Sequence, residues 1–212
     1  LLTGWAGNAS EDDQPSIATG GWVHALTSPR ALNLRAGRLI QRPFLPGLPL
    51  DEDSATGARA DLGCGTVPSA PNCEPASASY LAEPACDFKE IEALSGSRSW
   101  RVKTCATIDE GGAIEFDMGE DCGLTIRIEA NRLLVDRSAS RYPHGGSRVV
   151  TLEAGDANSI EIVHDRSLTE VFCGDGRLAF TFRSFLNAGS SGLRVRVEGD
   201  AALKDFVSAR LD

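Results

Sequence analysis

The stretch that decides the fold reads IEIVHDRSLTEVFCGDG and occupies residues 160–176. Its two runs of apolar and β-branched residues are separated by the polar triplet Asp165-Arg166-Ser167, and the pair Asp175-Gly176 ends it. Glycine tolerates the positive φ angles that tight hairpin turns require, so Asp-Gly beside apolar runs is a strong hairpin signal. The stretch therefore predicts neighbouring antiparallel strands.

The same pattern continues through residues 87–212. Apolar and polar residues alternate in 124–129 (LTIRIE), 178–182 (LAFTF) and 193–197 (LRVRV), and no convincing helical stripe competes with them. Period-two alternation places apolar side chains on one face of a strand. Many short strands of this kind indicate an antiparallel β-sandwich, with a barrel as the less favoured alternative. The strands expected here are 100–106, 113–118, 124–129, 132–135, 148–152, 160–163, 169–173, 178–182 and 193–197.

Residues 1–50 read as strands joined by turns. Runs 31–34 and 38–41 flank a short loop that contains Gly37, which predicts a hairpin. Prolines at positions 43, 46 and 49 then end regular pairing, because proline lacks the N–H that a ladder needs. Residues 51–86 are acidic and rich in small residues and proline, so we expect a connecting segment there and no folded unit.

Composition excludes several classes of partner. The net charge of -9 argues against nucleic acid and against an anionic membrane, because both would repel the chain. No apolar run approaches the roughly 20 residues needed to span a bilayer. The chain begins at Leu1, and Met118 is its only methionine. We expect it to be the downstream part of a longer protein, the alternative being a fragment trimmed for expression.

The six cysteines bear on the compartment. They are Cys64, Cys73, Cys86, Cys105, Cys122 and Cys173, and the sequence leaves their pairing open. Three lie in the proline-rich segment, where cross-links stabilise most, and Asn8-Ala9-Ser10 is a formal glycosylation acceptor. Both features favour a secreted protein, with buried thiols in a cytoplasmic protein as the alternative. No cysteine pair has zinc-knuckle spacing, so neither a metal nor a cofactor is expected.

No catalytic constellation is recognisable. The sequence has no G-x-S-x-G elbow, no phosphate-binding P-loop and no H-E-x-x-H helix. His24, His144 and His164 are expected to be structural or surface residues. The triplet Asp-Arg-Ser follows an apolar strand at 136–138 and again at 165–167, where the aspartate is expected to cap a turn. No catalytic residue is therefore assigned.

Trp5 and Asn8 are the candidate substrate-binding residues. They lie in the glycine-flanked run Gly4-Trp5-Ala6-Gly7-Asn8. An aromatic ring at the end of a strand can present its face to a sugar, and a nearby amide can bind hydroxyl groups. A buried tryptophan that only packs against its neighbours is the alternative interpretation.

Taken together, these segments resemble glycoside hydrolase family 32, which includes invertases, sucrose-6-phosphate hydrolases, inulinases and levanases. LTGWAGN at 2–8, GWVHALTSPR at 21–30 and GRLIQRP at 37–43 are similar to the last propeller blade of that family. LVDRS at 134–138 and residues 162–176 are similar to its C-terminal sandwich. The resemblance covers nearly the whole chain in order, except for the insertion at 51–86, which puts the subfamily in doubt.

The resemblance implies an all-β fold: residues 1–50 as the final blade of a five-bladed β-propeller, a Cys/Pro-rich connection at 51–86, and a sandwich at 87–212. It also implies a retaining reaction on fructosides, in which an Asp nucleophile and a Glu acid/base lie about 5 Å apart. The family's Asn-Asp-Pro-Asn-Gly, Arg-Asp-Pro and Glu-Cys motifs do not occur here. By resemblance, Trp5 helps to wall the sugar pocket.

We therefore expect the C-terminal portion of a β-fructofuranosidase, inactive alone, whose partners are a fructoside and an upstream propeller segment or chain. The alternatives are a non-catalytic sandwich that binds carbohydrate, and a structural domain that forms a homo-oligomer through a sandwich face.

Overall fold

The computed structural model describes residues 1–7, 24–48, 50, 58–59, 87–118, 123–140, 146–187 and 189–212. The described residues form β-strands and two short 3₁₀-helical turns, Glu92–Leu94 and Asp156–Asn158. None of their helices has the length and apolar character needed to cross a bilayer. The prediction of an all-β protein is confirmed.

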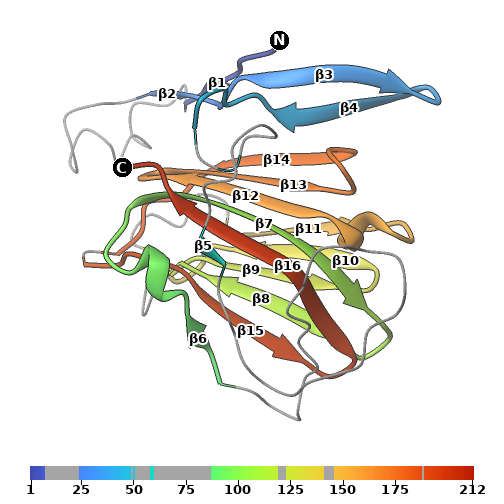
Figure 1. The fold of residues 1–212 in the computed structure, drawn as a ribbon, viewed down its shortest axis with the longest axis vertical. Coiled ribbons are helices and arrows are strands. Elements are labelled where there is room, and N and C mark those ends of the chain that lie inside the picture. Colours follow the sequence, from blue (N-terminus) through green and yellow to red (C-terminus); the bar gives the residue numbers. More distant parts are fainter. Residues whose placement is uncertain are drawn as a thin grey trace.

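Two antiparallel six-stranded sheets make a sandwich (Figure 1). The sheet nearer to the N-terminal strands, here called the proximal sheet, has the order β14-β13-β12-β7-β16-β5. The other, the distal sheet, has the order β11-β10-β9-β8-β15-β6. The proximal strands are β5 (Ala58–Arg59), β7 (Ser99–Ile108), β12 (Ile160–Asp165), β13 (Leu168–Cys173), β14 (Leu178–Arg183) and β16 (Ala201–Arg210). The distal strands are β6 (Lys89–Glu90), β8 (Ala113–Asp117), β9 (Thr125–Glu129), β10 (Arg132–Asp136), β11 (Ser147–Thr151) and β15 (Arg194–Glu198).

The core lies between the two sheets and follows the alternation of the sequence. On β9, Ile126 and Ile128 are fully buried, whereas Thr125, Arg127 and Glu129 are partly exposed to solvent. Trp100 of β7 and Phe116 of β8 are the largest apolar side chains completely enclosed there. Burial of such side chains removes apolar surface from water and is the main driving force for sandwich formation.

The deciding stretch forms two consecutive hairpins. Strands β12 and β13 pair from Ile160↔Cys173 to Asp165↔Leu168, which leaves a two-residue turn at Arg166 and Ser167. Strands β13 and β14 are joined by a four-residue loop, 174–177. Gly174, Asp175 and Gly176 all have positive φ in that loop. The predicted hairpin is thus confirmed, with a longer turn than the two-residue form that Asp-Gly most often makes.

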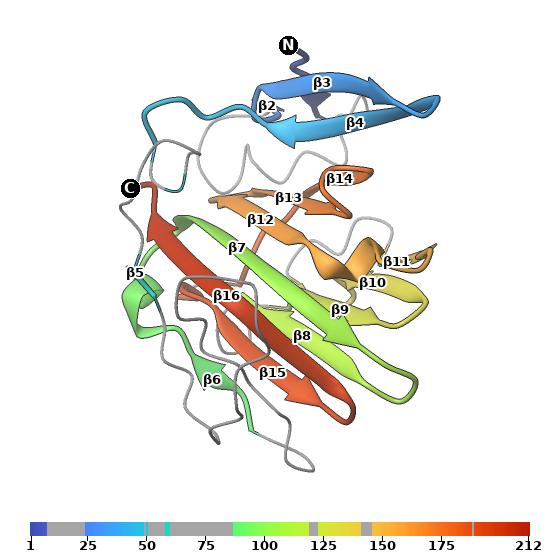
Figure 2. The same ribbon diagram turned by 45° about the vertical axis from the view of Figure 1, so that its right-hand side comes forward.

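The N-terminal strands form two small pieces. β3 (Arg30–Arg35) and β4 (Arg38–Pro43) make the predicted hairpin, and the turn residues Ala36 and Gly37 both have positive φ. β1 (Trp5–Ala6) pairs with β2 (Ala25–Leu26), and a bridge between Leu2 and Arg30 links the two pieces. Figures 1 and 2 show the β3–β4 hairpin over the end of the proximal sheet formed by β14 and β13.

The proximal sheet is consequently covered on both faces where the hairpin lies. All six residues of β13 are buried, because odd and even positions face different layers. Its strand-mate β12 is also buried on both sides at Ile162 and Val163. The segment expected to be purely connecting contributes Ala58–Arg59 as an edge strand against β16.

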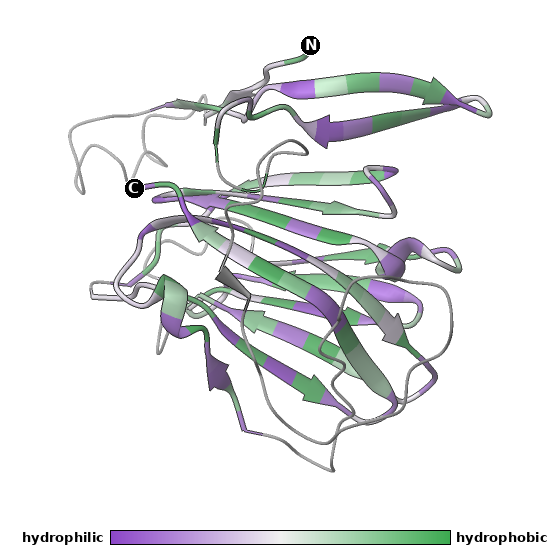
Figure 3. Cartoon of the chain, viewed as in Figure 1, coloured by the Kyte–Doolittle hydropathy of each residue, from purple (hydrophilic) through white to green (hydrophobic). Residues whose placement is uncertain are grey.

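The hairpin carries apolar side chains that the described residues leave in water. Leu32, Leu34 and Leu39 are 42%, 70% and 49% exposed, and the pairing of Leu34 with Leu39 places these three on one face. Figure 3 shows apolar and polar positions interspersed along β3 and β4, as they are along the strands of the sandwich.

Candidate functional site

Trp5 lies on β1 and faces solvent. Its side chain is 58% exposed, and its ring meets that of His24 edge-on with the ring centroids 5.0 Å apart. The described residues leave this ring largely in water, and the alternative of a tryptophan that packs within a blade stays a prediction. A partly exposed aromatic ring beside an imidazole has the form of a platform on which a sugar can stack. Asn8 lies outside the described residues.

Hydrogen bonds on both sides of Trp5 hold the strand that carries it. Gly4 N–H donates to the Thr27 hydroxyl at 2.8 Å, and Thr27 N–H donates to the Gly4 carbonyl at 2.9 Å. On its other side, the Ala6 carbonyl accepts a hydrogen bond of 3.0 Å from the guanidinium of Arg183 on β14. The sandwich therefore contacts the backbone directly beside the candidate sugar-binding residue.

A buried ion pair joins the hairpin to the proximal sheet. The Glu170 carboxylate on β13 accepts a hydrogen bond of 2.5 Å from Arg30 Nη2 and one of 2.7 Å from the Ser28 N–H. The Thr181 hydroxyl also donates to it. The side chains of Glu170 and Arg30 are only 1% and 9% exposed. Arg30 also donates to Gln41 at 3.0 Å and lies over the Phe172 ring. Sequence reasoning missed this pair.

Gly176 provides a second contact between the same layers. Its carbonyl accepts a 2.7 Å hydrogen bond from Gln41 N–H of β4. A Cβ atom at this position would overlap the carbonyl group of Gln41. The glycine that the sequence assigns to a hairpin turn is thus also required for the close approach of another strand.

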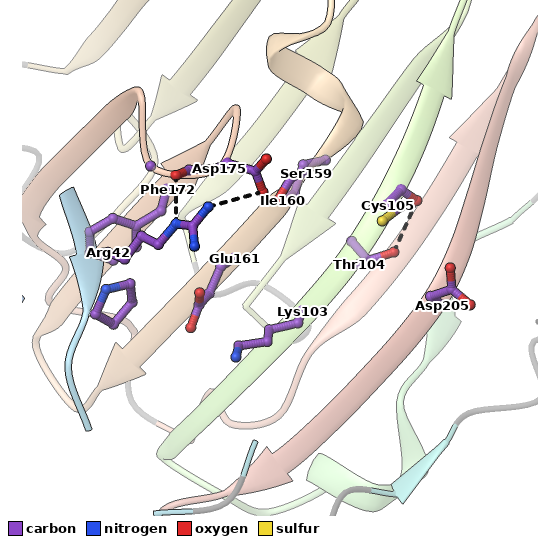
Figure 4. A pocket seen from close by; sticks show the side chains of 12 residues that line it. Arg42, Lys103, Thr104, Cys105, Ser159, Ile160, Glu161, Phe172, Asp175 and Asp205 are labelled. Carbon is purple, nitrogen blue, oxygen red and sulfur yellow. Dashed lines mark hydrogen bonds and ion pairs between the residues drawn. The ribbon is translucent and has the colours of Figure 1, made fainter. Parts of the chain in front are cut away.

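A pocket of about 300 Å³ opens where β4 meets the proximal sheet (Figure 4). Arg42, Lys103 and Glu161 line it, and Arg42 Nε donates to the Asp175 carbonyl at 2.9 Å. Burial raises the pKa of Glu161 despite a 2.6 Å ion pair with Arg101. A carboxyl with a raised pKa in a pocket is a candidate acid, but its close bond to an arginine favours a structural role.

The two Asp-Arg-Ser triplets differ: the first has the turn-capping role expected of it, whereas Asp165 of the second bonds a hydroxyl on the neighbouring strand β7. Asp136 accepts a 2.9 Å hydrogen bond from Ser138 N–H, and bonds to Ser138 lower its pKa. Asp165 accepts 2.7 Å from the Ser99 hydroxyl, and Arg166 takes a positive φ in the β12–β13 turn. Asp165 and Arg166 also line a pocket of about 540 Å³ beside Leu26 of β2.

The histidines that can be placed do not form a catalytic set. His164 is fully buried against Trp100, and its Nδ1 lies 2.8 Å from the Thr169 hydroxyl. Burial lowers the pKa of His164 to about 4, so its imidazole is neutral at physiological pH. His24 contacts Trp5, and His144 lies outside the described residues.

Metal and thiol chemistry find little support in the described ranges. No group of three or more His, Cys, Asp or Glu side chains suited to a metal occurs there. Cys105 is exposed and Cys173 is buried, and burial raises the pKa of Cys173 to about 12. Cys64, Cys73, Cys86 and Cys122, on which the expected cross-links depend, lie outside the described residues.

The outer face of the distal sheet is a lattice of ion pairs. Arg127 bonds Glu115, Glu129 and Glu198 at 2.8–2.9 Å, and Arg196 bonds Glu115 and Glu198. Two arginines also lie over the Phe88 ring. Among the described residues, the exposed Trp and Phe side chains are Trp5 and Phe44, both outside the sandwich. On this face the described residues thus present ion pairs, with Arg194 and Arg196 over the Phe88 ring.

Comparisons with known proteins point to one family. Residues 87–210 match the family described as "Glycosyl hydrolases family 32 C terminal". The chain is 28% identical over 210 residues to a sucrose-6-phosphate hydrolase of Staphylococcus xylosus, which covers 96% of this chain and 38% of that protein. It is 29% identical over 188 residues to a sucrose-6-phosphate hydrolase of Klebsiella pneumoniae, covering 87% of this chain and 31% of that protein.

Solved structures share the fold. The exo-inulinase of Aspergillus awamori superposes with a TM-score of 0.67 at 15% identity, over 99% of this chain and 40% of that one. The sucrose-6-phosphate hydrolase of Lactobacillus gasseri superposes with a TM-score of 0.60 at 16% identity, over 98% and 38%. The chain thus spans less than half the length of the proteins it matches. Because the family model covers more than half of its residues, the chain belongs to glycosyl hydrolase family 32, with its C-terminal domain at residues 87–210.

Proposed function

We propose that this chain is the C-terminal portion of a retaining glycosidase that releases fructose from sucrose or related β-fructosides. The acid/base and nucleophilic carboxylates are supplied by a propeller segment outside this chain. Residues 1–50 complete the last blade of that propeller, and the sandwich supports it. Trp5 and Asn8 contribute to the sugar-binding wall.

The observation that carries this proposal is the extent of the similarity. The family model ends at the sandwich, yet the similarity to the Staphylococcus protein covers 96% of the chain and so extends into the N-terminal strands. Those strands pack onto the sandwich through buried polar contacts and leave three leucines of the β3–β4 hairpin in water. An apolar hairpin face of this kind is suited to packing against a further blade.

The acidic residues of the proximal sheet also fit a supporting role. Glu170 and Glu161 are each bonded to an arginine, at 2.5 Å and 2.6 Å. A retaining glycosidase needs two carboxyl groups about 5 Å apart with opposite protonation states. The Glu170 pair joins two layers and the Glu161 pair joins neighbouring strands of one sheet, and such structural roles support placing the catalytic pair elsewhere.

The test uses the complete protein and this chain separately. With sucrose and sucrose-6-phosphate as substrates, we expect the complete protein to release fructose and residues 1–212 alone to release none. Replacement by Asn of the aspartate in an upstream Asn-Asp-Pro-Asn-Gly motif should abolish the release. Activity of the isolated chain, or inactivity of the complete protein on all fructosides tried, would contradict the proposal.

The carbohydrate-binding alternative makes a different prediction, namely sugar affinity in the sandwich alone. Titration of residues 87–212 with sucrose and with inulin by calorimetry measures it. We expect no heat of binding, because the described sandwich face carries ion pairs in place of exposed aromatic rings.

A further inference from the structure

Arg183 stands at the end of β14 and is held there by the sandwich itself. Its Nε donates to the Ser167 carbonyl at 3.3 Å, and its Nη2 donates to the Ser167 hydroxyl at 3.2 Å. Its guanidinium carbon lies 4.7 Å from the centre of the Phe185 ring. Bonds on two nitrogen atoms and a ring beneath the plane fix the orientation of the guanidinium.

The remaining terminal nitrogen points out of the sandwich to β1. Arg183 Nη1 donates to the Ala6 carbonyl at 3.0 Å, one residue after Trp5. β1 has only two residues, and it pairs with an equally short β2. Since Trp5 is 58% exposed, its own side chain has limited packing to hold it. The bonds between Gly4 and Thr27 hold the strand before Trp5, and the charged donor on the Ala6 carbonyl holds it on the other side of that residue.

We propose that Arg183 is a positioning residue for Trp5, through which the sandwich sets the geometry of the sugar-binding wall. This inference rests on the proposed function, in which Trp5 contacts the fructoside. Binding groups must be held within a fraction of an ångström of their productive position, and the residues behind them provide that precision. Loss of the Arg183–Ala6 bond should therefore weaken sugar binding and leave the chemical step unchanged.

The experiment is a double-mutant cycle in the complete protein, with sucrose as the probe. Initial rates give KM and kcat for the wild type, Arg183→Met, Trp5→Ala and the double variant. We expect Arg183→Met to raise KM about tenfold, as loss of a charged hydrogen bond does, with kcat changed less than about twofold. In the Trp5→Ala background, Arg183→Met should raise KM hardly at all, because the ring it positions is gone.

Two further variants separate positioning from general stability. Arg183→Lys keeps a charged donor, so its KM should lie between those of the wild type and Arg183→Met. Ser167→Ala removes one anchor of the guanidinium and should raise KM by a smaller factor, so the inference remains testable if Arg183→Met does not fold. Arg132→Gln is the matched control, since Arg132 is an exposed arginine on the distal sheet bonded to Glu129. It should leave KM and kcat unchanged.

The outcomes are distinguishable. Equal KM increases from Arg183→Met with and without Trp5 overturn the positioning role, as does a lowered melting temperature with unchanged KM. A wild-type protein that cleaves none of the fructosides tried, with sucrose, sucrose-6-phosphate and inulin among them, overturns the proposed function, and this inference with it.

Discussion

Arg30→Met removes the cation from the buried pair that joins the β3–β4 hairpin to the proximal sheet. Glu170 would keep the Ser28 N–H and the Thr181 hydroxyl as donors but would lose its only opposite charge among the described contacts. Removing one partner of a buried ion pair costs about 3–5 kcal/mol, because the other charge stays out of water. Because undocking of the hairpin exposes Glu170 to water, the substitution should lower the free energy of docking of the hairpin more than the free energy of unfolding of the sandwich.

Amide hydrogen exchange measures this directly. Gln41 N–H bonds Gly176 O across the joint, and its protection should fall by about 10²- to 10³-fold, limited by the docking free energy. Amides of β12 that pair with β7 should keep their protection, because they belong to the sandwich ladder.

The double variant Arg30→Met/Glu170→Met provides the decisive comparison. It removes both charges and should recover most of the lost protection, since an apolar pair can replace a buried ion pair at little cost. Arg38→Met is the control: Arg38 joins the same hairpin to Glu153, but the two side chains are 52% and 63% exposed. Water screens such a pair, and its loss should have little effect. Unchanged Gln41 protection in Arg30→Met would refute the reasoning. So would a loss of docking free energy in the double variant equal to the sum of the losses in Arg30→Met and Glu170→Met.

Three further predictions concern single sites. Gly176→Ala should lower the protection of Gln41 N–H and destabilise by about 1–3 kcal/mol, because the new Cβ meets the Gln41 carbonyl at a positive φ of 88°; wild-type exchange at Gln41 would rule this out. Unfolding free energy should fall by up to about 3 kcal/mol between pH 6.5 and pH 4, because the unfolded chain protonates His164 near pH 6.5 while burial holds its folded pKa at about 4. Denaturant titrations across that range should show this slope reduced in His164→Asn, and an identical slope would contradict the assignment. Iodoacetamide at pH 8 should spare Cys173, whose pKa burial raises to about 12, until the protein is unfolded; peptide mass mapping that finds Cys173 modified in the folded state would be inconsistent with this burial.

The strands of the sandwich could be predicted from the sequence where one face of the strand is buried and the other is exposed to solvent. The alternation in β9 identifies its buried isoleucines correctly, and the Gly37 loop identifies the β3–β4 hairpin. Both are local signals, because the period and the turn residues lie within a few positions of each other.

The joint could not be predicted, because its partners are far apart in the chain. Arg30 and Glu170 are separated by 140 residues, and Glu170 in the run LTEVFC reads as an ordinary outward-facing residue. Only the presence of a further layer makes it buried. Gly176 is visible in the sequence as a turn residue. Because the turn is a sufficient reason for a glycine, the sequence does not indicate that Gln41 also lies close to it.

The double coverage of β13 limits how this domain can be moved between proteins. Val163, Glu170 and Phe172 are 4%, 1% and 2% exposed. A chain cut at residue 87 would lack the β3–β4 hairpin, and Glu170 and Phe172 would then be exposed to water. A sandwich transferred without the hairpin would expose apolar side chains and an unpaired carboxylate on one face of the proximal sheet. An engineer who wishes to fuse it to another enzyme must bring residues 24–48 along or redesign that face for water.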